Sequence, residues 1–277
     1  MSRSLPLPDG HTLHVHTRRP AGDPWLHVLV VHGVAEHSGR YARTMDLLAD
    51  AGIAVAAYDH RGHGRSSGGR GHVDGWEDLT GDVGRMLAEV RSGAADHPVA
   101  ILAHSMGGLI ALDAVLAGRA APDLLVLSAP GLGDALPGWQ HALAPVVAAV
   151  APRLRFPNAW DGSVLSRDPS VAAAAAADPL NLRAVTARLG AGGFAAQKRV
   201  NAAVAGLPAA PLPTLVLHGT DDRLVPPRAT EALGRLPGVS RRLYPGLRHE
   251  LLNEPEGSAI VADIVGWLRD ADGQPGG

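Results

Sequence analysis

Short hydrophobic runs alternate along this chain with segments in which apolar residues recur every three to four positions. The runs are rich in Val, Leu and Ile, several are apolar on consecutive residues, and Gly or Pro marks most of their ends. Such runs are typical of β-strands that are buried on both faces of a sheet. We therefore expect strands at residues 11–17, 26–33, 53–59, 99–104, 124–130 and 214–219, the first two forming an opening pair.

Helical periodicity separates most of these strands. It covers residues 45–52, 76–90, the stretch after Met106, 229–236 and 258–268. Strands that alternate with helices indicate an α/β fold with a mostly parallel sheet and crossover helices. A chain of 277 residues, 46% of them hydrophobic, is long enough to bury a large core in one such fold.

Residues 131–207 break this alternation. They contain apolar helical runs such as LAPVVAAVAPRL and VAAAAAA, separated by prolines, without a convincing strand. The segment is too long for an ordinary connection, so we expect a helical cap, or lid, inserted over the sheet. The predicted core then comprises residues 1–130 and 208–270, and residues 271–277 form a frayed, disordered tail.

Six apolar residues of the predicted cap recur at helical spacing. They are Trp139, Leu143, Val146, Val147, Val150 and Leu154. We expect Pro145 to start or break the helix there. Because such a stripe is more often packed core than a ligand surface, burial is the preferred interpretation. The second interpretation is a lid edge that touches lipid aggregates and admits an acyl chain.

Composition and charge exclude several kinds of partner. The 25 basic and 27 acidic residues give a net charge of −2 and are scattered, which argues against nucleic-acid binding. With no cysteine, the chain lacks disulfides, thiolate catalysis and Cys-ligated metal. An apolar signal-peptide region and a membrane span are both missing from the pattern, so we predict a cytoplasmic protein with at most peripheral membrane association. The oligomeric state is not indicated.

The stretch ILAHSMGGLI places Ser105 between a predicted strand and a predicted helix. This is the position of the serine in the G-x-S-x-G turn, which exposes a hydroxyl at a helix N-terminus. Gly107 is the second glycine of that pattern, whereas Ala103 replaces the first and adds one methyl group. The turn alone is equally compatible with a serine that only caps the helix.

A nucleophilic serine needs a histidine base and an acid that orients the base. For a serine on such a turn, the chain order should be serine, acid, histidine. Asp221 and Asp222 directly follow the strand at 214–219, and His249 precedes the last helix, so all three kinds of residue occur in that order. One of the two aspartates is expected to cap a turn instead.

Catalysis by this route also needs two N–H donors for the oxyanion. The first is the backbone N–H of the residue after the nucleophile, Met106. The second comes from a loop after an earlier strand, where His32, Gly33 and Val34 stand. Only backbone groups are required, so the N–H groups of Val34 and Met106 qualify despite their apolar side chains.

Six motifs carry a family resemblance. HGVAEHSGRY, DHRGHGRSSG, AHSMGG, LSAP, LHGTDDRLVP and YPGLRHELLNEPE occur in that order. From about Leu26 to Leu268 the chain resembles the monoacylglycerol lipase and lysophospholipase group of α/β-hydrolases, with the cap only loosely matched. The resemblance implies Ser105 as nucleophile, His249 as base, Val34 and Met106 as oxyanion donors, and Asp222 rather than Asp221 as acid.

Two further groups of polar residues are given structural roles. His14 with His16 and His60 with His63 have no third ligand at a convincing spacing, so we predict no metal site. The loop at 59–66 is interpreted as a scaffold in which Arg and Asp side chains bind each other and nearby backbone. The resemblance makes Glu36 and His37 part of the framework of the oxyanion loop.

These observations predict a serine carboxylester hydrolase that needs no cofactor, with monoacylglycerol as the favoured substrate. A lysophospholipid, a short-chain ester or a thioester remains an alternative with the same triad. A serine at the nucleophile position argues against epoxide hydrolases and dehalogenases, which use a carboxylate. A more remote alternative is a non-catalytic binding protein that keeps the hydrolase scaffold. Cap residues within 131–207 are expected to bind the acyl group, although the sequence does not single out which.

Overall fold

The computed structural model describes residues 1–158 and 162–273. Within these residues an eight-stranded sheet has the order β1-β2-β4-β3-β5-β6-β9-β10. The strands are β1 (Ser2–Pro6), β2 (Thr12–Arg18), β3 (Leu26–Val31), β4 (Ile53–Tyr58), β5 (Val99–His104), β6 (Leu124–Ser128), β9 (Thr214–Gly219) and β10 (Val239–Tyr244). The six strands from β4 to β10 in this order are parallel, and β2 and β1 continue the sheet antiparallel.

All six predicted strands form, but two more strands of this sheet were missed and one pairing was wrong. β4 lies between β2 and β3, so the expected opening pair is not a pair. β1 and β10 are edge strands, and β10 alternates half-buried with exposed residues and carries two arginines. Charge on an edge strand prevents pairing with other chains, and it also removes the hydrophobic run by which a strand is recognised.

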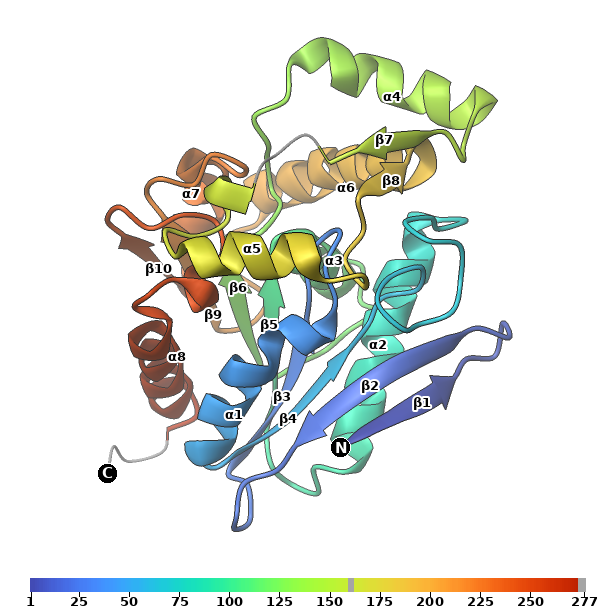
Figure 1. The fold of residues 1–277 in the computed structure, drawn as a ribbon. Coiled ribbons are helices and arrows are strands. Elements are labelled where there is room, and N and C mark those ends of the chain that lie inside the picture. The colour runs from blue at the N-terminus through green and yellow to red at the C-terminus, as the bar shows by residue number, and fades with distance from the viewer. Residues whose placement is uncertain (159–161, 274–277) are drawn as a thin grey trace.

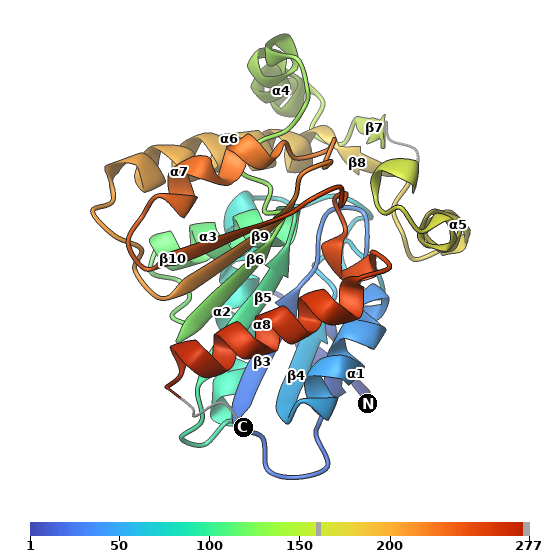
Figure 2. The same cartoon turned by 90° about the vertical axis from the view of Figure 1, so that its left-hand side faces the viewer.

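Helices cover both faces of the sheet (Figure 2). They are α1 (Ala42–Asp50), α2 (Trp76–Ser92), α3 (Met106–Leu116), α7 (Glu231–Gly234) and α8 (Gly257–Ala271). α1 and α8 lie on one face, and α2 and α3 on the other. Consecutive residues of β3 join opposite clusters, Val28 and Val30 with α1 and α8, Leu29 and Val31 with α2 and α3. This two-sided burial is the reason for the uninterrupted hydrophobic runs.

Residues 131–207, called here the insertion, lie over one end of the sheet (Figure 1). Their elements are α4 (Gly138–Val150), β7 (Arg155–Pro157), a 3-10 turn (Gly162–Val164), α5 (Pro169–Ala177), β8 (Ala184–Thr186) and α6 (Ala187–Gly206). The expectation of no strand is wrong, because β7 and β8 form an antiparallel pair. Three residues per strand are too few to produce a recognisable pattern.

The apolar stripe on α4 is exposed, so the preferred interpretation as packed core is wrong. Trp139 is 64% exposed and Val150 82% exposed, and Leu143, Val146 and Leu154 also face outward. α4 contacts α6, and its one fully buried residue is Ala148. The exposed residues of α4 are left uncovered by the rest of the described chain.

Pro145 neither starts nor breaks α4, which is continuous from Gly138 to Val150. Proline removes one backbone hydrogen bond and strains one turn, and the remaining hydrogen bonds keep the helix continuous.

No helix in residues 1–158 or 162–273 combines the length and apolar character needed to cross a bilayer. Of the predicted tail, residues 274–277 lie outside the described residues, and α8 itself extends to Ala271.

Candidate active site

Ser105 lies on a strained turn between β5 and α3. Its φ of 52° and ψ of −121° place it in a region that residues other than glycine rarely adopt. The end of β6 holds the turn, because the Ser105 N–H donates to the Ser128 carbonyl (3.0 Å) and the Gly131 N–H donates to the Ser105 carbonyl (2.8 Å). A Cβ on Gly107 would lie 2.3 Å from the Val31 carbonyl oxygen, so only glycine fits there.

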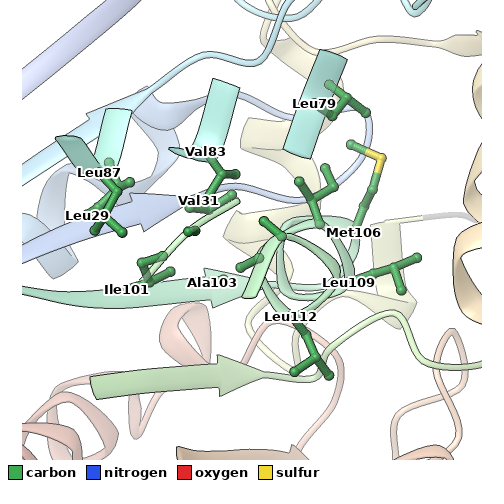
Figure 3. Close-up of a cluster of buried hydrophobic side chains, with 14 of the residues drawn as sticks. Leu29, Val31, Leu79, Val83, Leu87, Ile101, Ala103, Met106, Leu109 and Leu112 are labelled. Carbon is green, nitrogen blue, oxygen red and sulfur yellow. The ribbon is translucent and has the colours of Figure 1, made fainter. Parts of the chain in front are cut away.

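The neighbouring core supports this turn from below. Ala103 is fully buried on β5, beside side chains of β3, α2 and α3 (Figure 3). Met106 and Leu109, at the start of α3, belong to the same cluster. Apolar packing therefore anchors the first turn of α3, and this fixes the position of Ser105 at the end of β5.

The structure brings Ser105, His249 and Asp222 together in a chain of hydrogen bonds. The Ser105 hydroxyl lies 2.9 Å from His249 Nε2, and His249 Nδ1 lies 2.7 Å from Asp222 Oδ2. Because a carboxylate only accepts, Nδ1–H donates to Asp222, which leaves Nε2 to accept from the serine hydroxyl. All three residues are buried.

The two aspartates after β9 have different surroundings. Asp221 is exposed and accepts a hydrogen bond from the Thr220 hydroxyl. The Oδ1 atom of Asp222 accepts from the backbone N–H groups of Leu224 and Val225, both at 2.9 Å. Asp222, the residue that the family resemblance implies, is the one that contacts His249.

His218, which the sequence analysis did not single out, also contacts this carboxylate. It lies on β9 four residues before Asp222, and its Nε2 is 3.1 Å from Asp222 Oδ2 and 2.8 Å from the Val225 carbonyl. Both ring and carboxylate are completely buried. Its only sequence signal was its place on the strand that precedes the two aspartates.

Electrostatics favour an ionised acid next to a basic imidazole. Burial alone would raise the pKa of Asp222, but His249, His218 and the Val225 N–H stabilise its charged form and hold the pKa well below its usual range. Burial alone would lower the pKa of His249, yet the Asp222 carboxylate outweighs burial and raises it. Burial beside His249 lowers the pKa of His104 to about 4, which keeps this neighbour neutral.

The two residues expected to donate N–H groups, Val34 in the loop after β3 and Met106 at the start of α3, line the same space. Val34 and Met106 border a cavity with Ser105 and His249. The Val34 N–H has no protein acceptor among the described residues. The Met106 N–H belongs to the first residue of α3, where helix geometry supplies no acceptor. Both donors are therefore available to a ligand.

Glu36 and His37 hold this loop, as the resemblance implies. Glu36 Oε1 accepts from the Gly33 N–H (2.5 Å) and the Tyr41 hydroxyl (2.7 Å). Arg40 bridges Glu36 and Glu250, the residue after His249. His37 Nε2 lies 2.8 Å from Asp178 of the insertion. These contacts give the oxyanion loop a rigid polar support.

The cavity has a volume of about 370 Å³ and is lined mainly by apolar residues. Leu182, Val185, Leu189 and Phe194 come from the insertion, and Trp76 comes from α2. Ser105 and His249 border the same cavity. An apolar space that ends at a nucleophile suits a substrate with a hydrocarbon chain and a polar reacting group.

Polar side chains hold the loop at 59–66 through hydrogen bonds. In the described part of the chain, no group of three or more His, Asp or Glu side chains is arranged to hold a metal ion. Asp59 accepts hydrogen bonds from Ser38 and from the Arg65 N–H, while Arg61 pairs with Asp82. Arg61 thus braces α2, and Asp59 braces the loop's own backbone and the segment after the oxyanion loop.

A family model described as serine aminopeptidase, S33, matches residues 22–256. The chain belongs to this family. Members similar to it include a monoacylglycerol lipase of Mycolicibacterium smegmatis, which is 37% identical over 90% of both chains. The human monoglyceride lipase is 32% identical over 94% of this chain and 88% of its own.

Solved structures similar to this chain also include a monoacylglycerol lipase. The crystal structure of the Paleococcus ferrophilus monoacylglycerol lipase superposes with a TM-score of 0.83 at 28% identity, covering 94% of this chain and 99% of that one. The predicted α/β-hydrolase fold is thereby confirmed. As a member of its family the chain is a serine hydrolase.

Proposed function

We propose that this serine hydrolase cleaves carboxylic esters at Ser105 and that its substrate is a monoacylglycerol. The observation that carries the proposal is the chain of hydrogen bonds from the Ser105 hydroxyl through His249 to Asp222, beneath an apolar cavity. The names of the relatives, monoacylglycerol lipase and monoglyceride lipase, support an acyl glycerol as the ester.

The proposed reaction proceeds in two halves. Ser105 Oγ attacks the acyl carbonyl carbon while His249 Nε2 takes its proton, and the N–H groups of Val34 and Met106 stabilise the oxyanion. The C–O bond to glycerol then breaks, and His249 returns the proton to the departing alkoxide. In the second half, His249 deprotonates a water molecule that attacks the acyl-enzyme. The bond between the acyl carbon and Ser105 Oγ then breaks, His249 returns the proton to Ser105, and the fatty acid leaves. These steps require no cofactor.

In this scheme Asp222 makes His249 a stronger base. The raised pKa of His249 strengthens it as a proton acceptor, and the low pKa of Asp222 keeps the carboxylate ionised throughout. The imidazole must be neutral to act, so activity rises with pH as the pH passes the raised pKa of His249.

The insertion serves in this proposal as a cap over the substrate, with residues 131–207 as its bounds. The exposed apolar residues of α4 support transient contact with a membrane or with lipid aggregates. The cavity residues from α6 support binding of the acyl chain beneath it. A cytoplasmic location with peripheral membrane contact completes the proposal.

Labelling by a fluorophosphonate tests the nucleophile. Stoichiometric modification of Ser105 in folded protein is expected, whereas no labelling of folded protein favours a binding protein that lacks catalysis. A panel of monoacylglycerol, triacylglycerol, lysophosphatidylcholine and nitrophenyl esters of graded chain length then tests the substrate. The highest kcat/KM is expected for monoacylglycerol, and a higher value for lysophosphatidylcholine or a short ester would replace it as the substrate.

A further inference from the structure

The segment that carries His249 has little regular structure of its own. Residues 245–256 connect β10 to α8, and their only helical element is the 3-10 turn Leu251–Asn253. On the side facing the sheet, the Asp221 N–H donates to the Leu247 carbonyl (3.0 Å). A Cβ on Gly219 would come within 2.2 Å of that same carbonyl, so the loop lies directly on the end of β9.

On its other side, the loop is tied to the insertion through Glu254. This side chain is completely buried, and four donors converge on its carboxylate. The Arg248 N–H donates to Oε1 at 2.7 Å. Oε2 accepts from the Ser166 hydroxyl (3.2 Å), from the Arg167 N–H (3.0 Å) and from Arg167 Nε (3.1 Å). One carboxylate thus joins the residue before His249 to two residues of the insertion.

Further hydrogen bonds run between the same two segments. The Glu250 N–H donates to the Leu165 carbonyl (2.7 Å), and the Ser166 hydroxyl shares its one hydrogen between Glu254 Oε2 and the Asn253 carbonyl, which lies 3.0 Å away. The guanidinium of Arg248 donates to the carbonyls of Ser163 and Ser166. Both neighbours of His249 in the chain are therefore hydrogen-bonded to residues 163–167, Arg248 through its side chain and Glu250 through its backbone N–H.

We propose that Glu254 is a positioning residue for catalysis, through which residues 166–167 of the insertion set the position of His249 relative to Ser105. A buried carboxylate with four donors holds its neighbours more firmly than a neutral group, because each donor faces negative charge. The inference rests on the proposed roles of Ser105 and His249. It gives residues 163–167 a positioning role that is separate from acyl-chain binding.

The test replaces Glu254 by glutamine, which keeps the shape but turns one acceptor oxygen into a donor amide that faces N–H groups. Activity is measured on a soluble short-chain nitrophenyl ester, which needs little of the acyl cavity, and is divided by the titrated number of active sites. The Glu254→Gln variant is expected to lose up to about 10²-fold in kcat and in the rate of fluorophosphonate labelling, because small misplacement of a reacting group has effects of that size. KM should change little.

Asp82→Asn is the matched control. Asp82 is equally buried and is held by two hydrogen bonds from Arg61, and it lies on α2, on the face of the sheet opposite α8. This substitution should lower the melting temperature while labelling of Ser105 keeps its wild-type rate. A merely structural role for Glu254 predicts the same behaviour in Glu254→Gln, and labelling at the wild-type rate in that variant overturns the inference.

If Glu254→Gln does not fold, a second variant tests whether residues 166–167 position His249. Ser166→Ala combined with Arg167→Ala removes two side-chain donors from the insertion and leaves the Glu254 bond to Arg248 intact. A loss of roughly threefold to tenfold in the labelling rate is expected, the size of one or two net hydrogen bonds. An unchanged rate overturns the inference. If the wild-type protein is not labelled at all, the proposed function fails instead, so the two failures are distinguishable.

Discussion

β3 and α4 have similar hydrophobic content and opposite surroundings. Every residue of β3, LHVLVV, is buried, because β4 and β5 flank it and helices cover both faces of the sheet. α4 contains the run LAPVVAAV, yet it rests on α6 along one side and exposes Leu143, Val146 and Val150. Hydrophobicity measures what a residue gains from burial, whereas neighbouring elements determine whether burial takes place. The same kind of sequence therefore builds a core in one region and an apolar surface in the other.

The largest expected effect concerns the chemistry at the end of the buried sheet. Ser105→Ala and His249→Ala should each lower turnover by about 10⁴-fold or more, as loss of a triad residue does in other serine hydrolases. Asp222→Asn should approach that loss, whereas Asp221→Asn should stay near wild type because Asp221 is exposed and does not contact His249. Steady-state kinetics on one ester measures all four, and the reverse ranking of the two aspartates contradicts the assignment of the acid.

A Val→Asp substitution should lower the free energy of unfolding by different amounts in the buried sheet and on α4. Val126→Asp places a charge on the buried central strand β6 and should destabilise the fold by roughly several kcal/mol. Val150→Asp changes an exposed residue of α4 and should alter stability by no more than about 0.5 kcal/mol. Urea unfolding of the two variants provides the comparison, and equal destabilisation would show that α4 is covered in solution.

Substitutions on the exposed surface of α4 should instead lower activity on aggregated lipid substrate. The double variant Val146→Asp with Val150→Asp is expected to lose activity on aggregated long-chain monoacylglycerol while it keeps activity on a soluble short ester, because the exposed apolar surface then no longer favours lipid contact. Equal losses on both substrates would refute a role for α4 in lipid contact. Ala149→Asp, at another exposed position of the same helix, controls for added charge.

Buried polar groups near the sheet should make the fold sensitive to acid. Burial lowers the pKa of His63 to about 4, and it lowers those of His32 and His60 as well. Between pH 6.5 and 4 the unfolded chain binds a proton at His63 and the folded chain does not, so stability falls as the pH falls, by about 1.4 kcal/mol per pH unit for such a histidine. His63→Asn should flatten this dependence in urea unfolding between pH 7 and 5, and an unchanged slope would mean that His63 is protonated in the folded state.

The smallest expected effect is that of removing the methyl group of Ala103. Ala103→Gly should keep most of the activity and cost about 0.5–1 kcal/mol of stability through backbone entropy. Ala103→Val adds two methyl groups at a fully buried position, so it should cost about 1–3 kcal/mol and displace Ser105, with loss of activity. Thermal unfolding and ester hydrolysis measure both, and a fully active Ala103→Val variant would show that the turn is less tightly packed than the structure indicates.

Local signals account for what could be predicted. The central strands and the turn around Ser105 followed from hydrophobic runs and from a glycine at position 107, because both constraints act within a few residues. β10 was not predicted because, as an edge strand, it carries arginines that interrupt its hydrophobic pattern. β7 and β8 were not predicted because three residues are too few to form a recognisable pattern. His218 and Glu254 were missed for a different reason: their roles depend on carboxylate and imidazole groups that meet only in three dimensions.

The sequence by itself determined the α/β architecture and the candidate residues for catalysis, since alternating burial and the order of serine, acid and histidine are properties of the chain. Only the tertiary structure decided which aspartate faces His249, which apolar residues stay exposed, and how residues 163–167 come to contact the loop that carries His249. Each of these depends on contacts between segments far apart in the chain, and such contacts form when the sheet and the insertion pack together.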